Sequence, residues 1–282
     1  MKKGLVLEGG AMRGLFTCGV IDVLMENNIS FDGIMGVSAG ACFGLNYKSH
    51  QIGRGLRYNV KYCKDEHYGT IRSLLKTGDI YEPEYCYYTL PEKLDVFDYE
   101  TFKNDPTEFY AGCTDCVSGG PYYHRMTDCG PYDMKFLQAS ASMPLVSNVV
   151  KVGGHELLDG GIADSIPLRF MQDKGYDKNI VVLTQTENYV KKKNKALLLA
   201  RIMLRDYPNV IETLKNRHII YNDTVSYIKE EEAKGNIFVI RPKTKIPVSR
   251  IEKNPEKLKK AYDMGRAECE ENLPRLKEYL GI

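Results

Sequence analysis

The amino-acid sequence predicts an α/β fold with a mainly parallel central sheet and a C-terminal helical extension. Three observations carry this prediction. A short apolar run ends at a glycine-rich turn and leads into a helical pattern, a second unit of the same kind follows at once, and the C-terminal part has mostly helical spacing. Strands that alternate with helices form parallel sheets with right-handed crossovers, so the two units predict the start of such a sheet.

The first 50 residues contain both units. Residues 2–8 are a short apolar run that is typical of a buried strand, and residues 11–28 place apolar side chains near helical spacing before an Asn-Asn pair. Residues 29–37 predict the second strand, and residues 38–50 predict the helix that follows it.

The middle of the chain predicts a helical and loop region followed by further strands. Residues 50–105 are rich in tyrosine and charge and should cover one end of the sheet. The elements expected after them are strands within 107–119 and at 121–126, a helix at 134–143 ended by Pro144, a hairpin at 149–159 turning at Gly153 and Gly154, a helix near 166–174 and a buried strand at 178–185.

Helical spacing dominates after residue 191, apart from a late strand expected at 236–242. We therefore expect an α/β domain over residues 1–185 and a mostly helical region over residues 186–282 that packs on the same core.

The last helix has a clear start at residues 254–256, where Asn, Pro and Glu supply an N-cap, a first-turn proline and a first-turn acid. Pro274 should kink or restart this helix. An apolar stripe with steps of three and four residues should pack it on the core; its members are Leu258, Tyr262, Gly265, Cys269, Leu273, Leu276 and Leu280.

Composition indicates an ordinary globular protein of 282 residues, with 43% hydrophobic and 27% charged residues. The formal net charge of +2 is close to balance, so nothing indicates binding to nucleic acid. Nothing in the sequence indicates an oligomeric state.

The apolar segments are short. The N-terminal run stops at Glu8, whereas a secretory signal needs an apolar stretch of about 7–15 residues. The most apolar window, residues 196–204, contains Arg201 and is far shorter than the roughly 20 residues that span a bilayer. We therefore expect a cytoplasmic protein that contacts membranes only at their surface.

The cysteines predict neither disulfides nor a metal centre. In a reducing compartment they should be free thiols. Cys113 and Cys116 form a lone C-x-x-C without the second ligand pair that structural zinc requires. We expect no metal and no cofactor. The eight cysteines are Cys18, Cys42, Cys63, Cys86, Cys113, Cys116, Cys129 and Cys269.

The first of three segments with chemical meaning is Gly9–Gly14 (GGAMRG), directly after the first predicted strand. Backbone N–H groups at such a turn face negative charge, which is either a phosphate or the oxyanion of an acyl-transfer intermediate. A nucleotide site is disfavoured, because Ala11 stands where G-x-G-x-x-G needs glycine and no P-loop motif is present.

The second segment, Gly36–Gly40 (GVSAG), matches G-x-S-x-G between a predicted strand and a helix. This placement is typical of a nucleophile elbow, in which Ser38 occupies a strained turn and the glycines admit neighbouring backbone. The alternative is a tight helix entry with Ser38 as its N-cap.

The third segment, Asp159–Gly161 (DGG), places an acid at the end of the second hairpin strand. Taken alone, such a string is more often a simple turn.

None of the five histidines has the context of a catalytic base. In α/β-hydrolases the chain order is Ser, acid, His, and only His218 follows Asp159, in a polar stretch of a late helix. His155 shares a strand face with Asp159, but about 13 Å would separate them. We expect a surface or core position for all five, which are His50, His67, His124, His155 and His218.

Together the three segments resemble the patatin-like phospholipase family, which joins a G-G-G-x-[KR]-G loop, a G-x-S-x-G elbow and a D-G-[GA] acid in this order. Residues 139–144 (ASASMP) also look like family sequence. The resemblance extends from Gly9 to Gly161. The C-terminal 100 residues or so contain no catalytic motif of the family. It implies a three-layer α/β/α fold and a Ser–Asp dyad without histidine, with Ser38 as nucleophile and Asp159 as general base.

The resemblance also implies an oxyanion hole made by backbone amides. The amides concerned are those of Gly9, Gly10, Ala11, Met12 and Ala39. The positions that complete the motifs are Arg13, Gly14, Gly36, Gly40, Gly160 and Gly161. Ala11 departs from the family pattern, since its Cβ excludes backbone angles open only to glycine.

A Ser–Asp dyad makes two physical demands. The Asp159 carboxyl must be partly desolvated to become basic enough, because its free pKa is about 3.9. It must also lie within about 3 Å of Ser38 once substrate is bound.

The function expected is hydrolysis of a phospholipid or another acyl ester, with possible membrane contact at the protein surface. Residues 191–204, a basic start followed by apolar residues, suit a lid or an interfacial helix; the residues alone favour a solvated start and a buried helix. Two alternatives stay open: an esterase or thioesterase of soluble short-chain substrates, and a non-catalytic protein that binds lipid or nucleotide.

Overall fold

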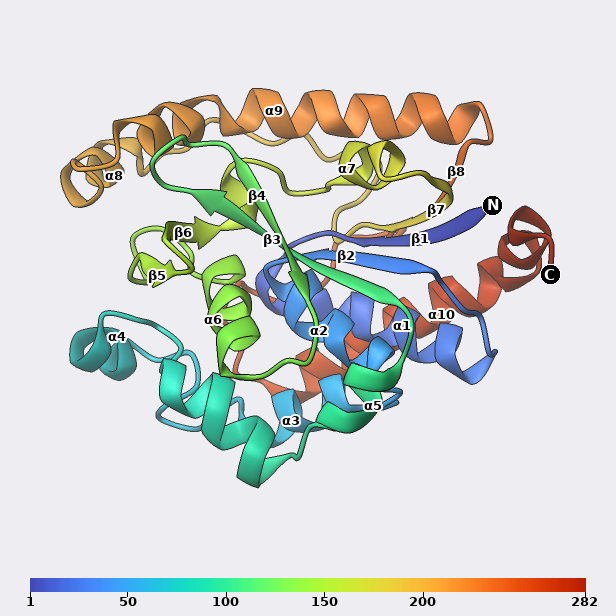
Figure 1. Ribbon diagram of the computed structural model, residues 1–282, viewed down its shortest axis with the longest axis horizontal. Coiled ribbons are helices and arrows are strands. Elements are labelled where there is room, and N and C mark those ends of the chain that lie inside the picture. The colour runs from blue at the N-terminus through green and yellow to red at the C-terminus, as the bar shows by residue number, and fades with distance from the viewer.

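The fold is built on one eight-stranded sheet. The computed structural model describes residues 1–282 (Figure 1). The strands are β1 Lys2–Leu7, β2 Gly33–Val37, β3 Glu108–Asp115, β4 Pro121–Met126, β5 Val150–Val152, β6 His155–Asp159, β7 Tyr176–Val182 and β8 Ile237–Ile240.

The helices cover both faces of this sheet. They are α1 Leu15–Glu26, α2 Ala39–Lys48, α3 Arg54–Tyr62, α4 Ile71–Thr77, α5 Tyr99–Asn104, α6 Pro131–Ser140, α7 Leu168–Asp173, α8 Leu197–Met203, α9 Pro208–Ala233 and α10 Pro255–Leu280. A π-helix spans Tyr85–Leu94, and short 3-10 turns span Ala11–Gly14 and Gly160–Ile162. No helix combines the length and the apolar content needed to cross a membrane.

The sheet is parallel at its centre and antiparallel at one side. The strand order is β5-β6-β3-β2-β1-β7-β8, with β4 on the other side of β3. The pairs β3–β2, β2–β1, β1–β7 and β7–β8 are parallel, while β3–β4, β3–β6 and β5–β6 are antiparallel. The predicted α/β class with a mainly parallel sheet is therefore confirmed.

The core lies on both faces of the sheet because strand side chains alternate between them. Leu5 and Leu7 of β1 pack into the larger apolar cluster with α1, α2 and α10. Val6, between them, packs into a second cluster with residues of α7 and α9. Figure 1 shows the resulting three layers, with α7 and α9 on one face and α1, α2 and α10 on the other.

The C-terminal helix α10 packs along α1. Its predicted apolar stripe is buried, apart from the half-buried Leu273, and the hydroxyl of Tyr262 donates to Asp22 at 2.7 Å. Of the two expected effects of Pro274, a kink or a restart, the restart does not occur, since α10 continues through the proline to Leu280. Buried Cys269 and Leu276 dock the helix on both sides of the proline, which offsets the one backbone hydrogen bond lost.

Two further boundaries differ from the expectation. The helix expected at 134–143 starts earlier, at Pro131, and ends at Ser140, before the proline that was expected to end it. Pro131 is its first residue, a position where the missing N–H costs nothing. Residues 141–149 are an irregular segment that leads to the β5–β6 hairpin.

Candidate active site

The end of β2 and the end of β6 meet on one edge of β3. Val37 pairs with Gly112 of β3, and Asp159 pairs with the next residue, Cys113. β4 occupies the opposite edge of the same β3 residues, so β2 and β6 share the remaining edge end to end. This topology brings Ser38, which follows Val37, next to Asp159.

Ser38 occupies a strained turn. Its backbone has φ 54° and ψ −122°, and α2 begins at the next residue, Ala39. A residue with a side chain in such a conformation costs about 1–3 kcal/mol, and surrounding structure must hold it there. The Ser38 amide donates to the Ser140 hydroxyl at 2.8 Å, and that hydroxyl donates to the Gly112 carbonyl at 2.6 Å. Ser140, inside the ASASMP stretch, thus ties the turn to β3.

The two glycines of G-x-S-x-G are required by close approach of backbone. A Cβ on Gly36 would overlap the backbone of Ala41, and a Cβ on Gly40 would overlap the carbonyl of Leu7 in β1. α2 can therefore start directly over the sheet, with Ser38 at its tip.

Ser38 and Asp159 are joined by a short hydrogen bond. The Ser38 hydroxyl donates to Asp159 Oδ2 at 2.7 Å, and the Gly161 amide donates to Oδ1 at 2.7 Å. Both side chains are buried. Burial raises the pKa of the Asp159 carboxyl above its ordinary value, while the Ser38 hydroxyl, Arg217, the Gly161 amide and Lys191 oppose the rise. The carboxyl is thus a stronger base than a solvated aspartate.

The loop after β1 presents free backbone amides beside Ser38. The amides of Gly9, Gly10, Ala11 and Ala39 form no hydrogen bond within the protein, and Ala11 and Ala39 line the same pocket as Ser38. The Met12 amide differs, since it donates to the carbonyl of Arg250 at 3.5 Å.

Ala11 adopts the left-handed conformation that the family pattern reserves for glycine. Its φ is 49°, which costs about 1–2 kcal/mol for a residue with a Cβ. The loop therefore keeps a glycine-like path in spite of the substitution.

The remaining motif positions are Gly14, Gly160 and Arg13. Gly14 packs against the ring of Phe43, where a Cβ would overlap it. A Cβ on Gly160 would overlap the carbonyl of Gly112. The Nε atom of Arg13 is buried and has no hydrogen-bond partner.

Two residues of α9, Arg217 and Tyr221, hydrogen-bond to the two segments beside the Ser38–Asp159 pair. The sequence analysis singled out neither residue. Arg217 Nε donates to the Gly161 carbonyl at 2.5 Å. Tyr221, one turn later on the same face, donates its hydroxyl at 2.7 Å to Glu8, the residue before the glycine loop. The one feature of the sequence that could have identified these two residues is the four-residue spacing of their polar side chains on a predicted helix.

Lys191 lies in the same region. Its Nζ atom is 4.0 Å from the centroid of the Tyr221 ring. Burial lowers the pKa of Lys191 to about 7, and Arg217, Arg13 and Arg250 add to the decrease, whereas Glu8 opposes it.

No histidine takes part in the pair. Four of them hydrogen-bond to other carboxylates, and His218 lies on α9 with a buried, unpartnered Nδ1. The four pairs are His50–Asp105, His67–Asp65, His124–Asp133 and His155–Asp115.

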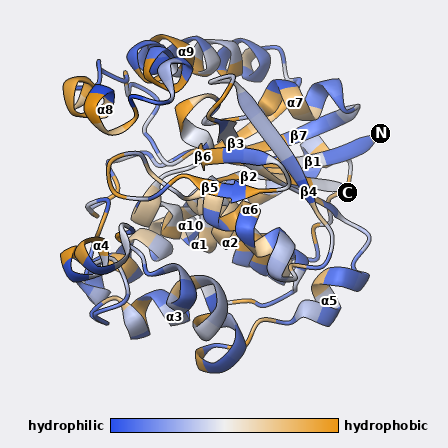
Figure 2. Ribbon diagram, turned by 60° about the vertical axis from the view of Figure 1, so that its left-hand side comes forward, coloured by the Kyte–Doolittle hydropathy of each residue, from blue (hydrophilic) through white to orange (hydrophobic).

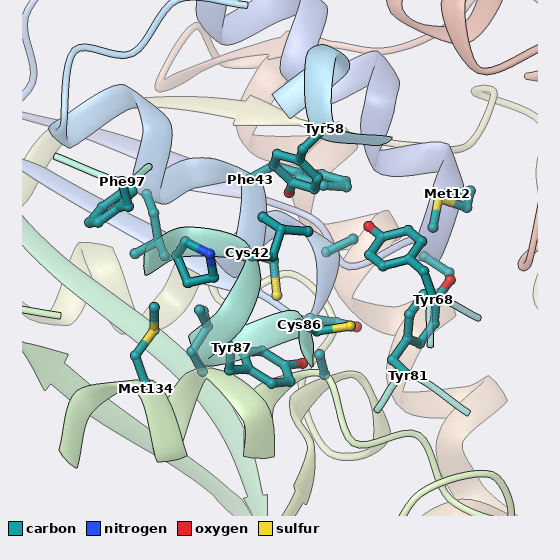
Figure 3. Close-up of a pocket in the computed structure, with 18 of the residues that line it drawn as sticks. Met12, Cys42, Phe43, Tyr58, Tyr68, Tyr81, Cys86, Tyr87, Phe97 and Met134 are labelled. Atoms are coloured by element: carbon teal, nitrogen blue, oxygen red, sulfur yellow. The ribbon is translucent and has the colours of Figure 1, made fainter. Parts of the chain in front are cut away.

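An apolar pocket opens beside Ser38. Of its 20 lining residues, 17 are hydrophobic. Figure 3 shows the sulfur of Cys42 and the rings of Phe43, Tyr58 and Tyr87 around this space. Its walls come from α2, α3, α6 and the π-helix. Such a pocket accommodates an apolar chain with its end at Ser38.

Comparison with known families gives two matches. Residues 5–171 match the model of the family described as patatin-like phospholipase. Residues 207–281, which contain α9 and α10, match a domain of unknown function (DUF6363).

Among individual proteins, the uncharacterized protein YjjU of Escherichia coli is 25% identical over 275 residues, which are 93% of this chain and 74% of that protein. Lysophospholipase nte1 of Aspergillus fumigatus is 29% identical over 185 residues, 62% of this chain and only 11% of the fungal protein. Lysophospholipase NTE1 of Cryptococcus neoformans is 26% identical over 189 residues, again 11% of its length.

Among solved structures, VipD from Legionella pneumophila is similar with a TM-score of 0.46 and 13% identity, over 97% of this chain and 67% of that one.

Proposed function

The chain belongs to the patatin-like phospholipase family, and from that premise we propose that it is a serine-dependent lipid acyl hydrolase with a Ser38–Asp159 dyad. The observation that carries the proposal is the 2.7 Å hydrogen bond from Ser38 to a buried carboxylate, at the end of an apolar pocket. The similarity to the fungal lysophospholipases, over 185 and 189 residues, supports lipid as the substrate class.

In the proposed first step, Ser38 Oγ attacks the ester carbonyl carbon while Asp159 Oδ2 accepts the hydroxyl proton. The Gly161 amide on Oδ1 keeps the carboxyl oriented with Oδ2 toward Ser38. The intermediate collapses to an acyl ester on Ser38, and the departing alcohol takes the proton from Asp159. Water then attacks the acyl ester while Asp159 accepts a proton from it, and Asp159 passes that proton to Ser38 Oγ as the bond between the serine and the fatty acid breaks.

The oxyanion of each tetrahedral intermediate would be held by the free amides of Gly10, Ala11 and Ala39. Amides fixed before the reaction stabilise developing charge without reorganisation. The Met12 amide is engaged with Arg250, so we leave it out of the proposed hole.

The pocket favours a long acyl chain over the soluble short-chain substrates of the alternative hypothesis. Its hydrophobic lining would gain about 0.8 kcal/mol for each methylene group that it buries. None of the proposed steps uses a metal ion or cofactor.

A series of p-nitrophenyl esters from acetate through decanoate to palmitate tests this proposal. We expect kcat/KM to rise with chain length while the pocket fills, and then to level off. A maximum at acetate would favour the short-chain esterase, and no hydrolysis of any ester by a folded protein would favour a binding protein.

A further inference from the structure

The helix α8 exposes most of its apolar side chains. Leu198 and Ile202, four residues apart, are 72% and 67% exposed, and Leu199 and Met203 are exposed beside them. Only the inner side of the segment is buried, where Ala200 and Leu204 pack against β6. The interpretation favoured from the sequence, a buried helix, is therefore wrong.

The short helix α4 repeats this pattern. Ile71 is 72% exposed and Leu75 is 83% exposed, again four residues apart on one face. Between them Ser73 is buried and donates to the carbonyl of Asp79, which turns the apolar face outward.

The two helices lie at the same end of the molecule, and the segments that flank α4 reach the pocket. Tyr68 and Tyr81, which flank α4 in sequence, line the pocket, as does Met143. The segment 143–149 connects the two sides: Asn148 hydrogen-bonds to Asp79 after α4, while Leu145 and Val149 pack against the cluster that contains Ala200 and Leu204 of α8. Figures 1 and 2 both show α4 and α8 at this end, and Figure 2 shows their hydrophobic residues.

The surroundings of α8 are strongly basic. The exposed cations are Lys192, Lys193, Lys195, Arg201 and Arg205. The single acid from residue 191 to 206 is Asp206, which pairs with Arg205 at 3.9 Å. On α4, by contrast, Arg72 and Lys76 are already paired with Glu66 and Glu82.

We propose that α4 and α8 form a docking face for the surface of a bilayer that contains anionic lipid. The docking face consists of Ile71, Leu75, Leu198, Leu199, Ile202 and Met203. Apolar side chains between cations insert at the boundary of head groups and acyl chains, and the cations attract anionic head groups. A second copy of this chain is disfavoured as the occupant, because the basic segment would face its own charge.

The inference rests on the proposed function, since docking here would place lipid esters beside the pocket that ends at Ser38. An acyl chain would then pass from the bilayer into the pocket along Tyr68, Tyr81 and Met143 without crossing bulk water.

Co-sedimentation with lipid vesicles tests the docking face directly. We expect the protein to bind vesicles with about one third phosphatidylglycerol much better than pure phosphatidylcholine vesicles, with binding that weakens at about 0.5 M salt. The double variant Leu198→Glu/Ile202→Glu and the single variant Leu75→Glu should each bind at least about tenfold more weakly. Ile219→Glu is the matched control, because Ile219 is a half-exposed apolar residue in the middle of α9 and is not part of the docking face. It should bind like the wild type.

Hydrolysis of a water-soluble short-chain ester separates this inference from the proposed function. The docking-face variants should keep that activity within about twofold of the wild type, which also shows that they fold. If the wild-type protein hydrolyses no ester of the series from acetate to palmitate, the proposed function fails while vesicle binding still decides the docking face. Vesicle binding unchanged in both charged variants would overturn the inference, as would a wild-type dimer that these variants dissociate.

Discussion

Val37 and Asp159 pair with consecutive residues of one strand, Gly112 and Cys113 of β3, although Ser38 and Asp159 are 121 residues apart in sequence. The ends of two strands of opposite direction meet at this point. The turn that holds Ser38 extends from one strand end, and the Asp159 carboxylate extends from the other. The sheet itself therefore sets the distance between the two groups, with no mobile loop between them.

Substitutions of the dyad should abolish hydrolysis without unfolding the protein. Ser38→Ala removes the attacking oxygen and Asp159→Asn removes the proton acceptor, so we expect kcat/KM to fall by about 10³-fold or more in each. His218→Asn should keep most of the activity, because His218 hydrogen-bonds to neither residue. Ester hydrolysis alongside circular dichroism checks all three. An inactive, folded His218→Asn protein would refute the dyad assignment.

Arg217 should set the pH range of activity through Asp159. Asp159 must be ionised to accept the proton, so activity falls as the pH drops through the pKa of its carboxyl. The Arg217 charge lowers that pKa and Lys191 assists, against the increase caused by burial. Arg217→Gln should therefore move the acidic limb of kcat/KM to higher pH.

Arg217→Lys is the matched control for this change, because it keeps the charge and loses the planar guanidinium that donates to Gly161. Its acidic limb should stay nearer that of the wild type. If the glutamine variant lowers activity with an unchanged limb, Arg217 acts only by holding the loop.

Replacing Ala11 by glycine should show how much stability the positive φ at this position costs. Ala11→Gly removes the penalty of a positive φ, about 1–2 kcal/mol, but adds about 0.4–1 kcal/mol of chain entropy to the unfolded state. Thermal denaturation should therefore show stability equal to the wild type or up to about 1.6 kcal/mol higher.

Ala11→Val should have the opposite effect on stability, because a β-branched residue is strongly disfavoured at positive φ. We expect a loss of at least about 1 kcal/mol and a lower kcat from a displaced loop. A valine variant as stable and active as the wild type would show that φ at position 11 is not positive in solution.

Much of the fold could be predicted from the sequence because its signals are local. Apolar runs that end at glycines predicted β1 and β2, and Gly153 and Gly154 predicted the turn between β5 and β6. The Ser38 and Asp159 segments could be named because glycine spacing marks them. Their meeting on β3 depends on which strand edges pair, and the sequence does not state that.

The remaining features depend on tertiary contacts. The roles of Ser140 and Arg217 depend on backbone groups that are distant in sequence: Ser140 bonds to the Ser38 amide and the Gly112 carbonyl, and Arg217 bonds to the Gly161 carbonyl. The sequence favoured a buried α8, because a short apolar segment has the same residue pattern whether or not a neighbouring element covers it. Pro274 was expected to kink or restart α10, and packing on both of its sides keeps the helix continuous.

The most direct test of the dyad is the intact mass of the protein after reaction with a long-chain fluorophosphonate, followed by peptide mapping. The account predicts a single adduct, located on Ser38, that is absent in Asp159→Asn. An adduct on another residue, or equal labelling of Ser38 in Asp159→Asn, would contradict it.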